Sequence, residues 1–164
     1  LVTDSGNIRL TFFENEAPNH VKNFKDLVSS GFYNGKTFHR IVPGFVIQAG
    51  RDSSTSYSSI DPEISKIHFK GALAAARQND DINPARRSDG YEFYICLKPQ
   101  PDLDGKYTVF GRTAEGFDAV SRISSAEKDG SDRPLKDIRI KRAYLETFFD
   151  SEKFEYYRRQ TENK

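Results

Sequence analysis

Hydrophobic and polar residues alternate in several stretches of this chain, and a period of two is typical of β-strands with one buried face. The clearest stretch is residues 91–97, where Tyr, Phe, Ile and Leu alternate with Glu, Tyr and Cys. The dipeptides Pro43–Gly44 and Asp104–Gly105 predict tight turns beside such stretches. The pattern as a whole predicts short strands within residues 6–14, 37–42, 45–50, 71–77, 91–97, 107–110 and 136–145.

Two segments follow a helical period instead. In residues 17–33 the apolar side chains recur every three to four positions, Pro18 suits a first helical turn, and Gly31 suits a C-terminal stop. Residues 114–124 repeat this spacing over a shorter length. Two helices placed far apart among many strands predict an antiparallel barrel or sandwich with helices at its ends.

The character of the chain changes after residue 143. Residues 144–164 are rich in charged and aromatic side chains, and we expect a C-terminal helix that packs on the barrel and frays at its end. Two long polar stretches, 51–67 and 78–90, have no period and predict loops. The expected organisation is therefore one domain over residues 1–143 followed by an extension over residues 144–164.

Composition narrows the classes of function. The formal net charge is +1, so there is no basic field of the kind that attracts nucleic acid. An apolar run of about eighteen residues, as a membrane span needs, is absent. Cys96 is the single cysteine, which excludes an internal disulfide. The lack of disulfides fits the cytoplasm, but many exported bacterial proteins lack them too, so the sequence leaves the compartment unknown, with the cytoplasm and export to a bacterial cell envelope both open.

The sequence lacks the motifs that several common kinds of metal and catalytic site require. His20, His39 and His68 have no zinc-like spacing. Asp102 and Asp104 resemble the start of a calcium loop, but the twelfth position is Thr113 rather than Glu. The sequence also lacks a G-x-S-x-G elbow and a phosphate-binding glycine loop. We therefore expect neither a metal nor a cofactor.

One stretch carries polar groups that a core does not need. Arg40 lies in an expected strand among apolar neighbours, and Phe45 and Gln48 follow just beyond the Pro43–Gly44 turn. Taken alone, Arg40 is compatible with a simple ion pair at the end of a strand. Together with the two residues after the turn, it also fits a binding site for a ligand with an apolar group.

Four segments of the chain resemble motifs of the cyclophilin family. Residues 38–50, FHRIVPGFVIQAG, resemble the family signature F-H-R-I/V-I/V-x-x-F-M/V-I/V-Q-G/A-G. GALAAAR at 71–77 is similar to G-x-L-S/A-M-A-N, and SDGYEFYI at 88–95 is similar to N-G-S-Q-F-F-I. LDGKYTVFGR at 103–112 resembles L-D-G-K-H/Y-T/V-V-F-G-K/R. The motifs occur in the family's order, and the resemblance spans about residues 1–143.

This resemblance implies a fold and an activity. The implied fold is a closed eight-stranded antiparallel barrel capped by two helices. The implied activity is cis–trans isomerisation of X-Pro peptide bonds in protein substrates, as an aid to folding. A cyclophilin-fold module that binds Pro-containing segments with little turnover is the alternative.

The resemblance also implies roles for individual residues. Arg40 would face the prolyl nitrogen, Gln48 would hold Arg40 and bond the substrate backbone, and Phe45 would contact the proline ring. Ala76 and Arg77 would offer main-chain hydrogen bonds to the bound peptide. The substrate-binding residues expected on this basis are Val46, Ala76, Arg77, Glu92, Tyr94, Leu103 and Tyr107.

Departures from the family pattern lead to further expectations. Glu92 stands where the family has Gln, and we expect it to pair with Arg40 or Arg77, or to form a balanced network with Arg51 and Arg77. Asp102 stands where strongly cyclosporin-binding members have Trp, and the chain contains no Trp. We therefore expect weak or no cyclosporin binding. We also expect the protein to be a monomer.

Overall fold

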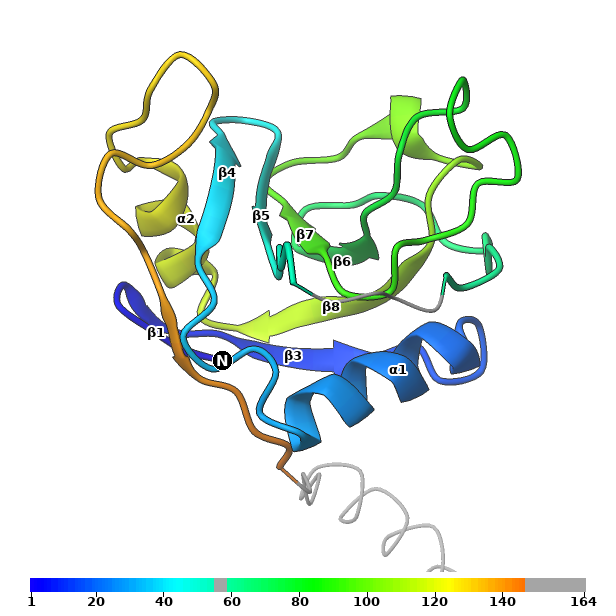
Figure 1. Ribbon diagram of the computed structural model, residues 1–164, viewed down its shortest axis with the longest axis horizontal. Coiled ribbons are helices and arrows are strands. Elements are labelled where there is room, and N and C mark those ends of the chain that lie inside the picture. The colour runs from blue at the N-terminus through cyan, green and yellow to red at the C-terminus, as the bar shows by residue number, and fades with distance from the viewer. Residues whose placement is uncertain (55–58, 147–164) are drawn as a thin grey trace, which may run out of the picture.

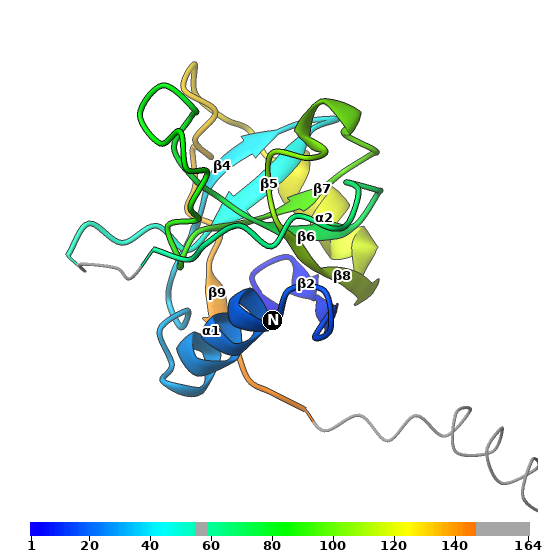
Figure 2. The same ribbon diagram turned by 90° about the vertical axis from the view of Figure 1, so that its right-hand side faces the viewer.

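The computed structural model describes residues 1–54 and 59–146. The described chain forms nine short strands, two α-helices and one turn of 3₁₀-helix (Figures 1 and 2). In chain order these are β1 (Val2–Thr3), β2 (Gly6–Asn7), β3 (Arg9–Phe12), α1 (Pro18–Ser29), β4 (Phe38–Val42), β5 (Val46–Ala49), β6 (Ala72–Ala75), β7 (Phe93–Cys96), η1 (Pro101–Leu103), β8 (Val109–Glu115), α2 (Phe117–Ser124) and β9 (Ile140–Arg142).

The strands form two antiparallel sheets within the described residues, and the expectation of one closed eight-stranded barrel is wrong for them. Six strands pair in the order β3-β8-β6-β7-β5-β4, and three pair in the order β2-β1-β9. Just before the edge strand β4, Thr37 forms an isolated bridge with Arg139, and main-chain hydrogen bonds from Phe38 to Ile138 and from Ile140 to Lys36 lie beside it, but no ladder forms there. At this edge the two sheets are therefore joined by a few main-chain hydrogen bonds and not by a continuous ladder.

The six-stranded sheet has two different faces because successive side chains of a strand point in opposite directions. One face carries the main core, with Ile47, Leu73 and Ile95 almost fully buried. The opposite face carries a smaller apolar cluster that includes Val46 and Tyr94. Each of the four segments that resemble family motifs contributes residues to this second cluster.

A β-bulge in β4 explains the sequence pattern of that strand. Phe38 pairs with Ala49 and Arg40 pairs with Gln48, so His39 is an extra residue with no partner on β5. The extra residue lets both Phe38 and Ile41 enter the main core although they are three positions apart. Arg40 is thereby turned to the other face, as bulges commonly do to side chains near functional sites.

The two helices lie where the periodicity predicts them. α1 begins with Pro18 and ends before Gly31, whose φ of +75° suits a left-handed C-terminal cap. Its Phe24 contacts the rings of Phe93 and Phe110 from the sheet at centroid distances of 5.4 Å each. α2 packs against β4 and β5 at the other end of the sheet (Figure 1). The two helices therefore cover different ends of the main core.

Some boundaries differ from the sequence expectation. The strand expected over 6–14 is split into β2 and β3, and the one expected over 136–145 shortens to β9. Residues 143–146 form neither helix nor strand. The helix expected over 144–164 falls mostly on residues 147–164, which lie outside the described part of the chain.

Candidate active site

Strand pairing places the candidate residues in one row. Arg40 on β4 lies opposite Gln48 on β5, Gln48 lies opposite Tyr94 on β7, and Tyr94 lies opposite Ala74 on β6. Residues in register across antiparallel strands point to the same face, with Cβ atoms about 4.5–5.5 Å apart. Four strands from three separate stretches of the chain therefore converge on one surface of the sheet.

A cavity of about 200 Å³ opens beside this row. Its small volume suits a compact apolar group rather than a large cofactor. It brings together nine of the ten residues expected from the sequence, while Glu92 lies behind Gln48 and outside the lining. The lining residues are Arg40, Phe45, Val46, Gln48, Ala76, Arg77, Tyr94, Leu103 and Tyr107.

Alanines next to the cavity give it room, and aromatic rings give it walls. Ala72 and Ala74 of β6, and Ala76 just after it, belong to the apolar cluster of this face and are buried, so this segment contributes only methyl groups there. Tyr94 and Tyr107 meet edge to face, with centroids 6.2 Å apart and planes at 80°. The contrast between short and bulky side chains produces an apolar slot in an otherwise filled face.

A buried histidine fixes the outer end of Tyr94. The Asp104 carboxylate accepts hydrogen bonds from the main-chain N–H of His68 at 2.7 Å and from its Nδ1 at 2.8 Å. With the proton on Nδ1, the Nε2 atom accepts the Tyr94 hydroxyl at 3.0 Å. Burial lowers the pKa of His68, although the Asp104 carboxylate acts in the opposite direction. His68 therefore serves as a neutral link between Asp104 and the wall of the slot.

Arg40 is held at the mouth of the cavity. Its Nη1 donates to Gln48 Oε1 at 3.3 Å, and its guanidinium carbon lies 5.8 Å from the centroid of the Phe45 ring. Gln48 Nε2 in turn donates to Glu92 Oε2 at 2.6 Å. Glu92 does not pair with Arg40 directly, so the sequence expectation of that ion pair is wrong.

The expected network of Arg51, Glu92 and Arg77 forms only in part. Arg51 Nε donates to Glu92 Oε1 at 3.1 Å. Arg77 pairs instead with Asp80 at 2.7 Å, and its guanidinium carbon lies 4.3 Å from the centroid of Tyr107. The Arg77 side chain is therefore a fixed part of the rim.

Two neighbouring residues at this rim differ in how their main-chain groups are hydrogen-bonded. The N–H of Ala76 donates to Glu92 O at 3.0 Å, and the carbonyl of Ala76 accepts from Asp89 at 3.1 Å. Neither main-chain group of Arg77 has a partner within residues 1–54 and 59–146. The Arg77 side chain is only 2% exposed while the residue is half-buried, so its main chain faces solvent. Arg77 rather than Ala76 is placed to bond an added peptide strand.

Sequence reasoning missed the residues that support the site from behind. The spacing of His68 and His39 in the sequence indicates no role for either residue. His68 is bonded to the Tyr94 hydroxyl although the two residues are 26 positions apart in sequence. His39 Nε2 lies 3.2 Å from Glu92 Oε2, and these two residues are also far apart in sequence. A local motif cannot signal pairs of this kind, because they exist only once the strands are in register.

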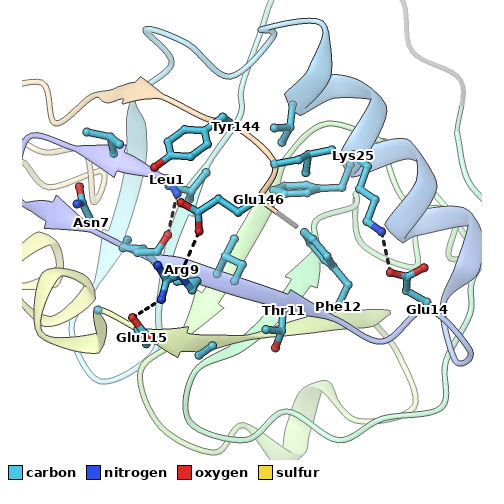
Figure 3. Close-up of a pocket in the computed structure, with 18 residues that line it drawn as sticks. Leu1, Asn7, Arg9, Thr11, Phe12, Glu14, Lys25, Glu115, Tyr144 and Glu146 are labelled. Carbon is cyan, nitrogen blue, oxygen red and sulfur yellow. Dashed lines mark hydrogen bonds and ion pairs between the residues drawn. The ribbon is translucent and has the colours of Figure 1, made fainter. Parts of the chain in front are cut away.

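A second hollow, of about 630 Å³, lies between α1, β3 and residues 144–146 and shares no lining residue with the first (Figure 3). Its charged side chains are paired with one another. Arg9 lies 2.7 Å from Glu115 and 3.4 Å from Glu146, and Lys25 lies 2.7 Å from Glu14. Size alone therefore does not mark the candidate site, and the smaller cavity carries the relevant groups.

No three His, Cys, Asp or Glu side chains of residues 1–54 and 59–146 gather as metal ligands. None of the helices in the same residues has the length and apolar character that crossing a bilayer requires.

Comparisons with known proteins agree on one family. A profile described as "Cyclophilin type peptidyl-prolyl cis-trans isomerase/CLD" matches residues 1–145. Human "Peptidyl-prolyl cis-trans isomerase-like 1" is 36% identical over 155 residues, which cover 88% of this chain and 89% of the human one. A "Peptidyl-prolyl cis-trans isomerase" of Synechococcus elongatus is 43% identical over 120 residues, which cover 70% of this chain and 79% of that protein.

Solved structures give the same result. A cyclophilin-type isomerase of Cryptosporidium parvum superposes with a TM-score of 0.83 at 26% identity, covering 90% of this chain and 96% of that one. A second structure of that protein, with a TM-score of 0.82, was determined in the presence of the dipeptide Ala-Pro. This chain therefore belongs to the cyclophilin-type peptidyl-prolyl cis–trans isomerase family and has its mainly β fold with two helices. Its activity is peptidyl-prolyl cis–trans isomerisation.

Proposed function

We propose that the 200 Å³ cavity binds the proline ring of a polypeptide substrate. We also propose that Arg40 accelerates rotation about the X-Pro bond by stabilising the twisted state. That rotation meets a barrier of roughly 18–20 kcal/mol because the nitrogen lone pair is delocalised into the carbonyl. When the bond twists, the lone pair returns to the nitrogen. A guanidinium directed at this nitrogen stabilises the twisted state without any covalent step.

The single observation that carries this proposal is the placement of Arg40 beside an apolar slot. Phe45, Val46, Tyr94 and Leu103 form the slot, and Arg40 is the cation held at its mouth by Gln48. The unpaired main chain of Arg77 supports binding of an extended peptide alongside. A guanidinium suits this role because it stays charged and presents several donors in a fixed plane. No proton transfer is needed, so His39 has no chemical role in the reaction.

The test is an NMR exchange or protease-coupled assay on a short X-Pro-Phe peptide. We expect Arg40→Ala to lower kcat/KM by roughly hundredfold, as is typical when one electrostatic donor is removed from an active site. Arg40→Lys keeps the charge and should recover only part of the activity, because a single ammonium cannot keep both the Gln48 bond and its direction. Arg112→Ala, which removes an exposed arginine of β8, is the matched control and should leave kcat/KM unchanged.

Two outcomes would overturn this assignment. If Arg40→Ala retains full turnover in a folded protein, the proposed role of Arg40 is wrong. If the wild-type protein binds the peptide but does not accelerate exchange, the proposed isomerase mechanism is wrong and the protein is a binding module with little turnover.

We further propose that the protein acts as a monomer that aids folding and binds cyclosporin weakly. The exposed Asp102 of η1 supports the second point, because a charged side chain there offers no broad apolar contact. Calorimetry should give a cyclosporin Kd above about 1 μM, or about −8 kcal/mol. A submicromolar value, or a dimer in sedimentation, would contradict these points.

A further inference from the structure

A buried carboxylate lies directly behind the catalytic pair. Glu92 immediately precedes β7, and its side chain is only 9% exposed. Its oxygens meet three groups: Gln48 Nε2 at 2.6 Å, Arg51 Nε at 3.1 Å and His39 Nε2 at 3.2 Å. It does not line the cavity, so it has no direct contact with the slot in which the substrate is placed.

The chemistry of this carboxylate determines how the Gln48 amide is oriented. An ionised carboxylate accepts hydrogen bonds and cannot donate them, whereas a glutamine amide has one donating and one accepting end. The end of Gln48 that faces Glu92 must therefore be its NH₂ group. The oxygen is then forced to face Arg40, where it accepts from Nη1 at 3.3 Å.

The charge of Glu92 is maintained by its neighbours. Burial alone would raise the pKa of Glu92, but the nearby His39 ring and the Arg51 guanidinium lower it below its ordinary value. The contact with His39 is a close approach rather than an aligned hydrogen bond, because neither ring nitrogen of His39 has a hydrogen-bond partner in the described chain. Arg51 is 63% exposed and bonds the oxygen that Gln48 does not use. Glu92 is thus held ionised with one oxygen available to Gln48.

From this geometry we propose that Glu92 is a positioning residue that fixes the flip of the Gln48 amide and, through it, the direction of the Arg40 guanidinium. The inference rests on the proposed function of Arg40 and adds a residue that acts through Gln48. A bond from the amide NH₂ to a carboxylate also makes the amide oxygen a better acceptor, since linked hydrogen bonds polarise one another. Glutamine at this position would accept either orientation of Gln48 and would leave Arg40 less well directed.

The decisive experiment is a double-mutant cycle with Glu92→Gln and Gln48→Ala, measured as kcat and KM. Glu92→Gln keeps the shape of the side chain and should lower kcat about tenfold, equivalent to ~1.4 kcal/mol, with KM nearly unchanged because the slot is intact. In the Gln48→Ala background the same substitution should change kcat by less than twofold. Independent, multiplying effects would overturn the inference, because they would mean that Glu92 does not act through Gln48.

A second measurement does not depend on turnover. The side-chain amide protons of Gln48 should shift and exchange faster with water in Glu92→Gln, as observed by NMR. Unchanged Gln48 signals would overturn the inference even if the enzyme is active, whereas shifted signals in a protein without isomerase activity would locate the failure in the proposed function.

The matched control is Glu63→Gln. Glu63 is likewise a shielded carboxylate beside a histidine, 2.6 Å from His20 Nδ1, but it lies outside the cavity lining. It should lower the stability of the fold and leave kcat and the Gln48 signals unchanged. If Glu63→Gln lowers kcat as much as Glu92→Gln does, the loss in both variants comes from general destabilisation of the fold. That result would refute the positioning role of Glu92.

Discussion

At the scale of single residues, the proline slot depends on polar groups placed behind apolar surfaces. Tyr94 presents its ring to the cavity while its hydroxyl is bonded to the buried His68. The same arrangement recurs where Gln48 is bonded to Glu92. In both cases the group that faces the substrate is fixed by a partner that the substrate does not touch, which reduces the freedom that binding must remove.

Removal of the Tyr94 hydroxyl tests this view. Tyr94→Phe keeps the ring but leaves His68 Nε2 without its donor, and an unmade bond in a buried site costs about 1–3 kcal/mol. We expect the free energy of unfolding to fall by about that amount in urea denaturation, while KM for an X-Pro peptide changes by less than about threefold. Unchanged stability would show that the His68 bond contributes nothing to the wall.

At the scale of secondary-structure elements, α1 depends on a distant carboxylate. Its N-cap residue is Ala17, which has no side-chain acceptor for the free N–H groups of the first turn. Glu63 supplies both oxygens, accepting from the N–H groups of Asn19 and His20 at 3.0 Å each. The His20 ring then accepts from Ser88 at 2.8 Å, so a helix and two long loops are tied together.

Glu63→Ala should therefore destabilise the fold more than an ordinary surface substitution. The loss of two N–H acceptors at the positive end of a helix predicts a decrease of about 2–3 kcal/mol in the free energy of unfolding. Thermal or urea denaturation measures the change, and Glu14→Ala is a suitable control because that residue forms an exposed ion pair. An equal effect in both variants would contradict the capping role.

The sequence predicts elements and local motifs well, and long-range pairs poorly. Arg40, Phe45 and Gln48 lie within nine residues and could be recognised together. The bond from Gln48 to Glu92 spans 44 positions and the bond from His20 to Glu63 spans 43, and neither leaves a periodic signal. The family resemblance predicts a closed barrel, but in the described residues an isolated bridge and a few main-chain hydrogen bonds join the two sheets in place of a continuous ladder.

At the scale of the whole molecule, stability depends on pH through groups that burial has shifted. Burial raises the pKa of Asp89 to about 7, while its side chain accepts hydrogen bonds from the N–H groups of Tyr91 and Glu92 at 3.1 and 3.0 Å. An acid whose folded pKa lies above its unfolded value stabilises the fold at low pH and loses that contribution as pH rises. His20 and His68 act in the opposite sense, since burial lowers the pKa of each.

Asp89→Asn isolates the contribution of Asp89. Below about pH 4 the variant and the wild type should have similar unfolding free energies, because Asp89 is protonated in both states. Between about pH 4 and pH 7 the variant should become progressively more stable than the wild type, by about 1–2 kcal/mol once partial exposure is allowed for. Denaturation curves at several pH values measure this difference, and a constant difference across the range would contradict it.

The bulge at His39 has a consequence for how such a site can arise or be lost. If residues 38–41 paired without a bulge, strict alternation would carry Arg40 into the core or expel Phe38 from it. The direction of Arg40 therefore depends on the position of the bulge, between Phe38 and Arg40, as well as on the identity of the side chains. Removal of His39 would leave a regular ladder in which Phe38 still faces the core and Arg40 still faces Gln48, so the site tolerates either length of this strand provided that the bulge absorbs the additional residue.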